Sequence, residues 1–266
     1  MPTVTDEAIC IRHWDYSETS QTVGLFSRDH GVVRGLAKGA KREKGRFSGG
    51  IDLLARGEFV AIIKPGRDLH TLTEWTLLEV YWPLRRHLEA HRLGLFMADL
   101  IHHMVQDHDP HPGLYRTLVT ALGGLGDSAN HGRLTLAFLW SLLTETGYQP
   151  SIETHGEGDA GNTDGDGQSV YLFAPESGGL IRGGDAGPRW RVRRETVELL
   201  RRVTTGAPLP AQDTPAVGRA CRLLAAYVRH ILGHEPPTMS MVFPDLQTPR
   251  TSSSGDPTRR DGSSRR

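Results

Sequence analysis

Cysteines and long apolar runs are nearly missing from this sequence of 266 residues. The two cysteines, Cys10 and Cys221, are far apart, so the chain lacks the disulfide framework that small secreted proteins use. No stretch approaches the roughly 18 to 20 apolar residues that span a bilayer. The first residues, MPTVTDEAIC, also lack the basic and apolar segments of a signal peptide. These absences predict a cytoplasmic protein.

An excess of charge of either sign is also absent, because 31 Lys and Arg residues balance 31 Asp and Glu residues. A uniformly basic, nucleic-acid-coating surface is therefore excluded, although the balance does not tell where charges of one sign gather. The informative property is the distribution of charge along the chain.

Several enzyme signatures are missing as well. The sequence has no Gly-Lys-Ser/Thr of a P-loop, no Gly-x-Ser-x-Gly elbow and no Cys-x-x-Cys. These absences favour a binding protein with no catalytic residue and no cofactor.

One group of side chains keeps a metal-dependent hydrolase open as an alternative, because such enzymes need histidines and carboxylates that converge on an ion. The group consists of His102, His103, Asp107, His108, Asp109 and His111. His102 and His103 are adjacent and face different ways on a helix, so a polar helix end fits the pattern better.

Residues 1–80 are predicted to form a small β-barrel or sandwich. Five short apolar or alternating runs, separated by turns, follow one another without a helical pattern, around residues 8–11, 22–26, 32–37, 59–63 and 69–77. In the last run, Thr71, Thr73 and Trp75 alternate with Leu72 and Glu74. This pattern is typical of a pleated strand.

Residues 81–240 are predicted to form a helical domain. Apolar residues recur there every three to four positions, including Leu84, Leu88, Leu95, Phe96, Leu100, Ile101 and Met104. Thr214 and Pro215 predict a helix start, and the apolar face that follows ends at Gly233. Within this domain we expect a flexible acidic insert over 147–190, because residues 145–167 are acidic and glycine-rich without Lys or Arg. Residues 241–266, rich in Arg and Ser, are expected to be a disordered tail.

The most informative segment is basic and glycine-containing, and it lies within the predicted barrel. Residues 34–46 hold one acid against six basic residues, namely Arg34, Lys38, Lys41, Arg42, Lys44 and Arg46. A basic loop can follow a phosphate backbone and release its counterions, which gives salt-sensitive affinity without sequence preference. A solvated loop that only keeps the protein in solution is the alternative.

Aromatic residues supply the second element of single-strand recognition, because bases stack on them. Phe26 and Phe59 lie in apolar runs and are predicted to belong to the core, whereas Trp14, Tyr16 and Phe47 lie in polar surroundings. We expect the latter three to be the candidates for base stacking, with Trp14 assigned to DNA binding.

A second basic stretch surrounds Trp190 and supplies three further candidate DNA contacts, Arg191, Arg193 and Arg194. Arginines beside an exposed tryptophan would suit DNA. The alternative is that these guanidinium groups cover a helix end or pair with Glu195 and Glu198.

Three blocks of sequence resemble the bacterial recombination mediator family RecO in their order and spacing. The blocks are Tyr16-Ser17-Glu18-Thr19-Ser20, Leu25-Phe26-Ser27-Arg28-Asp29-His30-Gly31 and Leu36-Ala37-Lys38-Gly39-Ala40-Lys41-Arg42. Leu72-Thr73-Glu74-Trp75, Thr146-Gly147-Tyr148-Gln149-Pro150 and the segment from Phe173 to Leu180 are similar to later parts of the family. The resemblance covers about residues 1–235.

The resemblance implies an α+β chain with an N-terminal OB-fold barrel followed by a mostly helical domain. It implies binding to single- and double-stranded DNA, annealing of complementary strands, and help in loading the recombinase RecA. The implied partners are RecR and the single-stranded-DNA-binding protein, and the implied location is the nucleoid. Among the basic residues, Lys38, Lys41 and Arg42 match the family, while Lys44 and Arg46 extend the group by charge alone.

The sequence departs from the family at a zinc module. Many members hold zinc with two cysteine pairs, one after the Gly-Tyr-x-Pro block and one after the Gly-Gly-Leu block. Here residues 153–158 read ETHGEG and residues 181–185 read IRGGD, so four thiolate ligands cannot be assembled. We expect a degenerate, zinc-free module and no metal site.

These observations lead to a non-enzymatic, DNA-binding recombination mediator in gap and double-strand-break repair. A protein-interaction scaffold that has lost DNA binding is the alternative, because the chain is neutral overall and lacks the zinc ligands.

Overall fold

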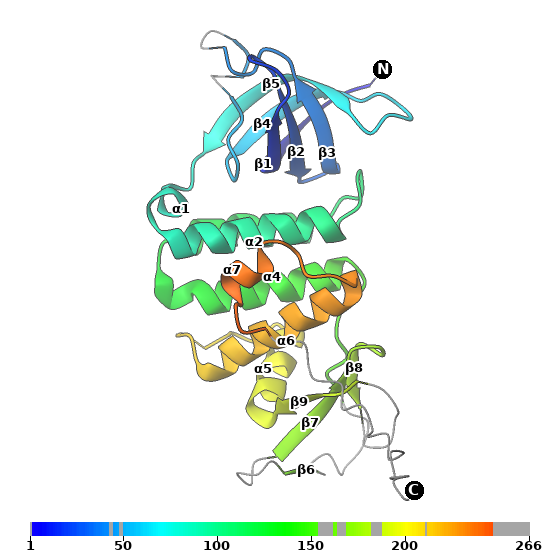
Figure 1. Cartoon of the computed structure of the whole chain (residues 1–266), viewed down its shortest axis with the longest axis vertical. Helices are drawn as coiled ribbons and strands as arrows, with labels where there is room; N and C mark the ends of the chain where they lie inside the picture. Colours follow the sequence, from blue (N-terminus) through cyan, green and yellow to red (C-terminus); the bar gives the residue numbers. More distant parts are fainter. Residues whose placement is uncertain are drawn as a thin grey trace, which may run out of the picture.

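The computed structural model describes residues 2–42, 45–47, 50–153, 162–163, 169–181, 188–210 and 212–246. In space, a barrel, a stack of helices and a small sheet lie one below the other (Figure 1). In the chain, the strands of the small sheet come before the last three helices. The α+β class and the N-terminal OB-type barrel predicted from the sequence are confirmed. None of the helices in the described ranges has both the length and the apolar character needed to cross a membrane.

Five strands close the barrel in the order β1-β2-β3-β5-β4. The strands are β1 (Thr3–Asp15), β2 (Gln21–Ser27), β3 (Gly31–Ala37), β4 (Arg56–Ile62) and β5 (His70–Glu79). The pairing of β3 with β5 is parallel and all the others are antiparallel. Gly35 lies at this parallel closure, where a Cβ atom would come within 2.6 Å of the Leu72 side chain. Glycine therefore lets β3 and β5 approach each other.

The first strand is buried on both faces, which explains the continuous apolar run at residues 8–11. Ala8 and Cys10 belong to the core inside the barrel. Ile9 and Ile11 belong instead to the larger core shared with the helices. Because successive side chains of a strand point to opposite faces, one strand contributes to both cores and attaches the barrel to the helical body.

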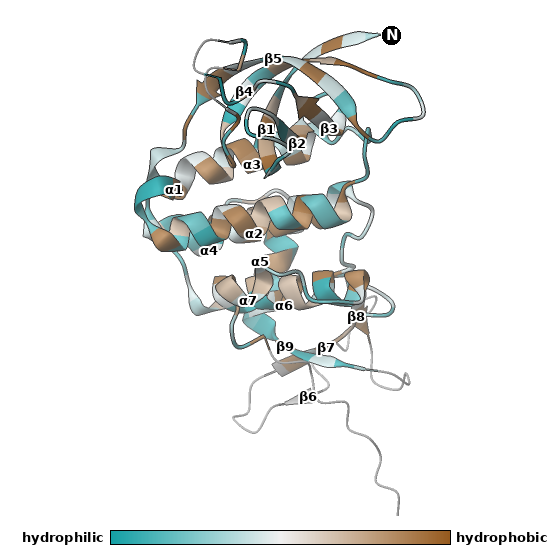
Figure 2. Ribbon diagram, turned by 45° about the horizontal axis from the view of Figure 1, so that its top comes forward, coloured by the Kyte–Doolittle hydropathy of each residue, from teal (hydrophilic) through white to brown (hydrophobic). Residues whose placement is uncertain are grey.

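The helical body begins with α1 (Trp82–Arg86) and α2 (Leu88–Met104), followed by α3 (Pro112–Gly124), the short η1 (Ser128–Asn130) and α4 (His131–Glu145). It is completed by α5 (Arg194–Thr204), α6 (Pro215–Leu232) and α7 (Met239–Val242). Hydrophobic and hydrophilic residues alternate along these helices (Figure 2), and buried leucines such as Leu100, Leu118 and Leu142 form the shared core. Burial of one face of each helix holds the stack together.

The predicted ends of α6 are confirmed. The Thr214 hydroxyl accepts a hydrogen bond from Val217 N, Pro215 opens the helix, and Gly233 ends it with a positive φ of 71°. These residues satisfy backbone groups that a helix terminus leaves without partners.

The prediction is wrong for one residue of the apolar helix face, Leu88. Leu88 is 62% exposed because His87, in an extended conformation, ends α1 and starts α2. The break changes the helical phase, so Leu84 is buried and Leu88 is not.

The prediction of a flexible insert over 147–190 is wrong for its described part. There β7 (Ser169–Ala174) pairs with β6 (Asn162–Thr163), β8 (Gly179–Ile181) and β9 (Trp190–Arg193). Phe173 and Val192 of this sheet are buried in the shared core. Composition alone did not reveal that these few apolar residues pack against the helices. The tail predicted from residue 241 also begins too early, since Val242, Phe243 and Leu246 pack on the core; residues 247–266 lie outside the described ranges.

Candidate nucleic-acid interface

A tight turn after β3, residues Lys38–Arg42, here called the basic turn, carries three of the predicted cations. Gly39 has a φ of 71°, and its carbonyl oxygen accepts a hydrogen bond of 3.1 Å from Arg42 N. Ala40 is fully buried in the barrel core and anchors the turn. Lys38 and Arg42 are exposed on either side of this anchor. The turn therefore presents cations from a fixed backbone.

The basic turn is attached to the loop between β1 and β2. Lys41 N donates to the Thr19 carbonyl oxygen at 3.1 Å, and Gly39 N donates to Ser20 Oγ at 3.2 Å. The Lys41 ammonium forms an ion pair of 2.6 Å with Asp15, the residue that follows Trp14. These contacts place the basic turn beside the end of β1 that carries the exposed aromatic residues.

The predicted cations of residues 34–46 do not form a single free cluster. Arg34 pairs with Asp107 at 3.1 Å, Arg46 pairs with Glu74 at 2.9 Å, and Lys41 pairs with Asp15. Within the described part of the chain, Lys38 and Arg42 are exposed and form no ion pair. Lys44 lies outside the described residues. The sequence could not reveal these partners, because Asp107 and Glu74 are distant along the chain.

Two of the three predicted stacking residues are exposed, and the third is not. Trp14 is 51% exposed and Tyr16 is 65% exposed. Phe47 is only 5% exposed and belongs to the barrel core, so the prediction for Phe47 is wrong. A hydrogen bond of 2.9 Å from Trp75 N to the Arg46 carbonyl oxygen fixes the polar loop against β5 and turns Phe47 inward. Phe26 and Phe59 are fully buried, as predicted.

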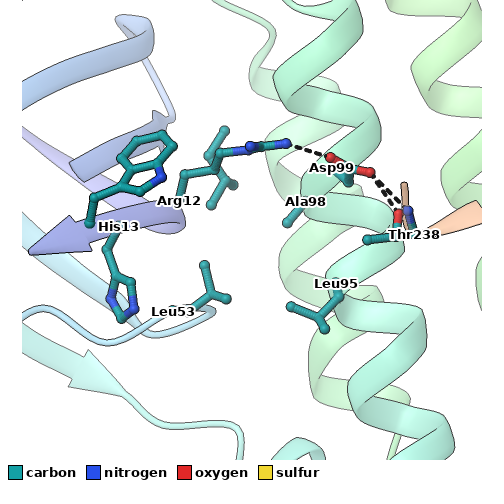
Figure 3. Close-up of a pocket in the computed structure, with 9 residues that line it drawn as sticks. Arg12, His13, Leu53, Leu95, Ala98, Asp99 and Thr238 are labelled. Atoms are coloured by element: carbon teal, nitrogen blue, oxygen red, sulfur yellow. Dashed lines mark hydrogen bonds and ion pairs between the residues drawn. The ribbon is translucent and has the colours of Figure 1, made fainter. Parts of the chain in front are cut away.

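A β-bulge redirects the end of β1. The pairing with β2 shifts between Cys10 and Arg12, so that Ile11 and Arg12 line the same pocket, between the barrel and α2 (Figure 3). The Arg12 guanidinium lies 6.0 Å from the centroid of the Trp14 ring. Bulges commonly re-aim side chains in this way, and the sequence pattern gave no sign of this one.

The sequence also missed the residue that holds Arg12. Asp99 of α2 is 5% exposed, and its carboxylate accepts a hydrogen bond of 2.7 Å from Arg12 and another of 2.8 Å from the Thr238 hydroxyl. The available signal was a lone carboxylate within an apolar stretch of the helix, Met97 to Ile101. A buried carboxylate requires such partners.

The second basic stretch lies at the other end of the molecule, on β9 below the helical stack in Figure 1, whereas the barrel lies above it. Arg191 and Arg193 are exposed and border a pocket of about 290 Å³, here called the arginine groove, which Arg219 and Arg222 of α6 also line. The sequence pattern does not indicate these two α6 residues, because only the tertiary fold brings α6 beside β9.

Two details of the second stretch differ from the prediction. Arg194 points to Glu198 with a hydrogen bond of 2.7 Å, so the alternative of pairing within the helix holds for this residue. Trp190 is half-buried and stacks on Phe173 at a centroid distance of 5.7 Å and an interplanar angle of 16°, so it is not the exposed tryptophan considered above.

The histidines considered for a hydrolase are dispersed over separate contacts. His103 Nδ1 contacts the Asp99 carbonyl oxygen at 2.8 Å, His111 lies between Asp109 and Glu145, and His108 contacts His70. Among the described residues, no group of three or more His, Cys, Asp or Glu side chains could hold a metal ion. The hydrolase alternative therefore has no assembled set of metal ligands among the described residues.

The two cysteines are buried thiols. Burial raises the pKa of Cys10 and of Cys221 to about 12, which disfavours the thiolate that metals require. Most of the positions that correspond to the zinc module, 154–161 and 182–187, lie outside the described residues.

The buried His70 and the half-buried His102 predict a pH dependence of stability. Burial, followed by the Arg12 cation, lowers the pKa of His102 to about 4; burial and the neighbouring His108 lower the pKa of His70. His70 Nδ1 accepts from Lys64 N, so its Nε2 proton points at His108 Nε2, 2.7 Å away. Both histidines therefore contribute stability when neutral.

The sign of the effect follows from these lowered pKa values. The unfolded chain, with histidine pKa values near about 6.5, takes up protons before the folded chain does, so stability falls as pH decreases below that value. We expect the free energy of unfolding to drop by about 1–2 kcal/mol between pH 7 and pH 5. When Tm is measured by thermal unfolding across this range, it should depend less steeply on pH in the double variant His70→Gln, His102→Gln. The control His87→Gln, at an exposed site, should keep the steeper dependence. Equal slopes in both variants would contradict the assignment.

Comparison with known sequences connects these features to a family. Residues 1–81 match the sequence model described as "Recombination protein O N terminal", and residues 85–240 match "Recombination protein O C terminal". The chain is 36% identical over 146 residues to a protein of Rhodopirellula baltica named DNA repair protein RecO, an alignment that covers 55% of this chain and 54% of that relative.

Two further relatives carry the same name. The protein of Salinibacter ruber is 34% identical over 119 residues, covering 45% of this chain and 46% of the relative. The protein of Anaeromyxobacter sp. is 28% identical over 233 residues, covering 85% and 90%. The matched segment thus spans about half the length of the first two relatives and most of the third. Since the two domain matches together extend from the first residue to residue 240, the chain belongs to the recombination protein O (RecO) family.

Proposed function

We propose that this chain is a non-catalytic DNA-binding mediator of recombinational repair. The observation that carries the proposal is the juxtaposition, at one end of the barrel, of the exposed cations Lys38 and Arg42 with the exposed rings of Trp14 and Tyr16. Cations on a fixed turn neutralise phosphates, and exposed rings stack on unpaired bases. The relatives' name, DNA repair protein, agrees with this chemistry.

The ion pair of Lys41 is compatible with DNA binding. Its partner Asp15 has a side chain that is 70% exposed, and exposed ion pairs contribute roughly 0–1 kcal/mol to stability. Lys41 can therefore exchange Asp15 for a phosphate at low cost. Arg34 and Arg46, in similarly exposed pairs, are secondary contacts in this proposal.

The arginine groove supplies a second surface for DNA at the opposite end of the molecule. Two such surfaces can hold two strands on one molecule, which raises the local concentration of one strand near the other and so favours annealing of complementary segments. We further propose that DNA bound in this way is handed to RecA with the help of RecR and the single-stranded-DNA-binding protein, that the chain is associated with the nucleoid, and that it works without zinc.

The test of the proposal is a salt-dependent titration of a labelled single strand with the full chain. With about three phosphates neutralised, the logarithm of affinity should fall with the logarithm of salt concentration with a slope of about −2. Affinity should depend little on base sequence. Absence of binding even at low salt would favour the alternative of a protein-interaction scaffold. The zero net charge and the three ion-paired cations support that alternative.

A variant of the arginine groove should separate annealing from binding. In Arg193→Gln, Arg222→Gln, the barrel surface is intact, so a short single strand should bind within about 2-fold of wild type. Annealing of two complementary strands, measured by energy transfer between their fluorescent labels, should slow about 5-fold or more, because the second surface has lost two phosphate contacts.

The neighbouring Arg194→Gln is the matched control. Arg194 follows Arg193 in sequence but already pairs with Glu198 outside the groove. Its annealing rate should remain near that of wild type. Equal rates for the groove variant and this control would show that the groove does not hold the second strand.

A further inference from the structure

The junction between the barrel and α2 contains a pocket of about 220 Å³, here called the Trp14 pocket (Figure 3). Its apolar surface comes from Ile11, Leu53, Leu95 and Ala98. Trp14 contributes an aromatic side chain, and Arg12, Asp99 and Thr238 contribute polar groups. His13 adds an imidazole (Figure 3). The lining therefore combines an apolar surface, two aromatic rings and one polar end, drawn from segments far apart in the sequence.

The polar end of the pocket is built rather than incidental. Asp99 is buried and receives hydrogen bonds from Arg12 and from both the backbone N and the hydroxyl of Thr238. This network fixes the Arg12 guanidinium close to the Trp14 ring, at 6.0 Å. A guanidinium carries five N–H donors in a rigid plane, so Arg12 has donors beyond the one it gives to Asp99.

The pocket adjoins the basic turn. Trp14 directly precedes Asp15, and Asp15 binds the Lys41 ammonium at 2.6 Å. A polyanion that lies across Lys38, Lys41 and Arg42 and continues along the end of β1 would reach Trp14 at the mouth of the pocket. Its charge complements the turn, and an unpaired base attached to the same backbone supplies a flat heterocycle for Trp14 with acceptor atoms for Arg12.

We propose that the Trp14 pocket takes one unpaired nucleobase of a single strand whose phosphates lie on the basic turn. This inference rests on the proposed DNA-binding function and adds to it a defined base site, shared by the barrel and α2. Because a paired base cannot leave its stack without cost, the pocket favours single strands over duplex. An aromatic side chain of a protein partner has similar shape but lacks the adjoining phosphates.

The experiment compares oligonucleotides that differ only in a base. A labelled thymidine oligonucleotide and the same oligonucleotide with abasic sites have equal numbers of phosphates, so any difference in affinity reports base contacts. The wild-type chain should bind the abasic strand about 10-fold more weakly, as expected for one stacked base. Trp14→Ala should lose most of this difference, with the remainder due to stacking on Tyr16, and Trp14→Phe should restore part of it.

Two further variants keep the result interpretable. Trp82→Ala removes a tryptophan that is 61% exposed at the start of α1, away from the pocket, and should behave like wild type. Leu95→Trp fills the pocket while retaining Trp14, and should likewise remove most of the difference between the two strands.

The outcomes separate this inference from the proposed function. If wild type binds the two strands equally well, or if the abasic sites weaken Trp14→Ala as much as wild type, the base site is overturned while DNA binding stands. In that case, the remaining candidate occupant of the pocket is an aromatic side chain of a protein partner. If wild type binds neither strand at low salt, the proposed function itself fails.

Discussion

Reversing the three charges of the basic turn, in Lys38→Glu, Lys41→Glu, Arg42→Glu, is expected to weaken binding to single-stranded DNA about 100-fold at roughly 0.1 M salt. Each substitution removes an attraction to phosphate and adds a repulsion. The slope of affinity against salt should also become shallower by about 2, since roughly three fewer phosphates are neutralised. Fluorescence anisotropy of a labelled strand at several salt concentrations measures both quantities.

The matched control reverses three charges on the helical body, in Arg86→Glu, Arg92→Glu, Arg116→Glu. It changes the net charge of the chain equally, so it isolates position from the general effect of charge. We expect it to bind within about 3-fold of wild type, because the affected arginines lie away from the barrel end. Indistinguishable binding by the two triple variants would remove the basic turn from the DNA interface.

The ion pairs make a further distinction within the same segment. Replacing Lys38 or Arg42 by alanine should weaken the affinity of the chain for single-stranded DNA more than replacing Arg34 or Arg46. Lys38 and Arg42 form no ion pair among the described residues. The paired side chains must first give up Asp107 or Glu74. The opposite order would mean that the carboxylates do not compete with DNA.

The second large effect concerns stability, and it arises at Asp99. Asp99→Ala is expected to lower the free energy of unfolding by about 3 kcal/mol, because it leaves Arg12 and Thr238 without their shared acceptor. For a chain of this size, that corresponds to a decrease in Tm of roughly 6–12 °C. Denaturant titration and thermal unfolding followed by circular dichroism provide the two measurements.

A surface pair provides the comparison for Asp99. Asp52, with a side chain that is 71% exposed, accepts a hydrogen bond of 3.3 Å from Arg85. Asp52→Ala should cost less than about 1 kcal/mol, as exposed ion pairs usually do. A double-mutant cycle between Arg12→Ala and Asp99→Ala then isolates the coupling of the pair. A loss at Asp99 no larger than that at Asp52 would show that the network does not hold the barrel, α2 and the segment before α7 together.

The sequence predicted the elements whose signal is local. Apolar runs and turn residues identified the barrel strands, and Thr214, Pro215 and Gly233 marked the ends of α6, because helix caps depend on residues a few positions apart. The same locality explains the errors at Leu88 and in the small sheet. The periodicity of apolar residues does not reveal the one-residue break at His87, which exposes Leu88. It also does not reveal that helices later in the chain bury the small sheet.

What the sequence by itself determined is the α+β architecture, the basic turn and the absence of four cysteines for zinc. Only the tertiary structure decided which cations are paired, that Phe47 is in the core, and that Arg12, Trp14 and Asp99 share a pocket. The physical reason is that hydrogen bonds, ion pairs and pockets join residues far apart in sequence, as the bond between Asp99 and Thr238 does across 139 positions. In addition, bulges at Ile11 and Thr73 exchange the faces of a strand without changing its composition.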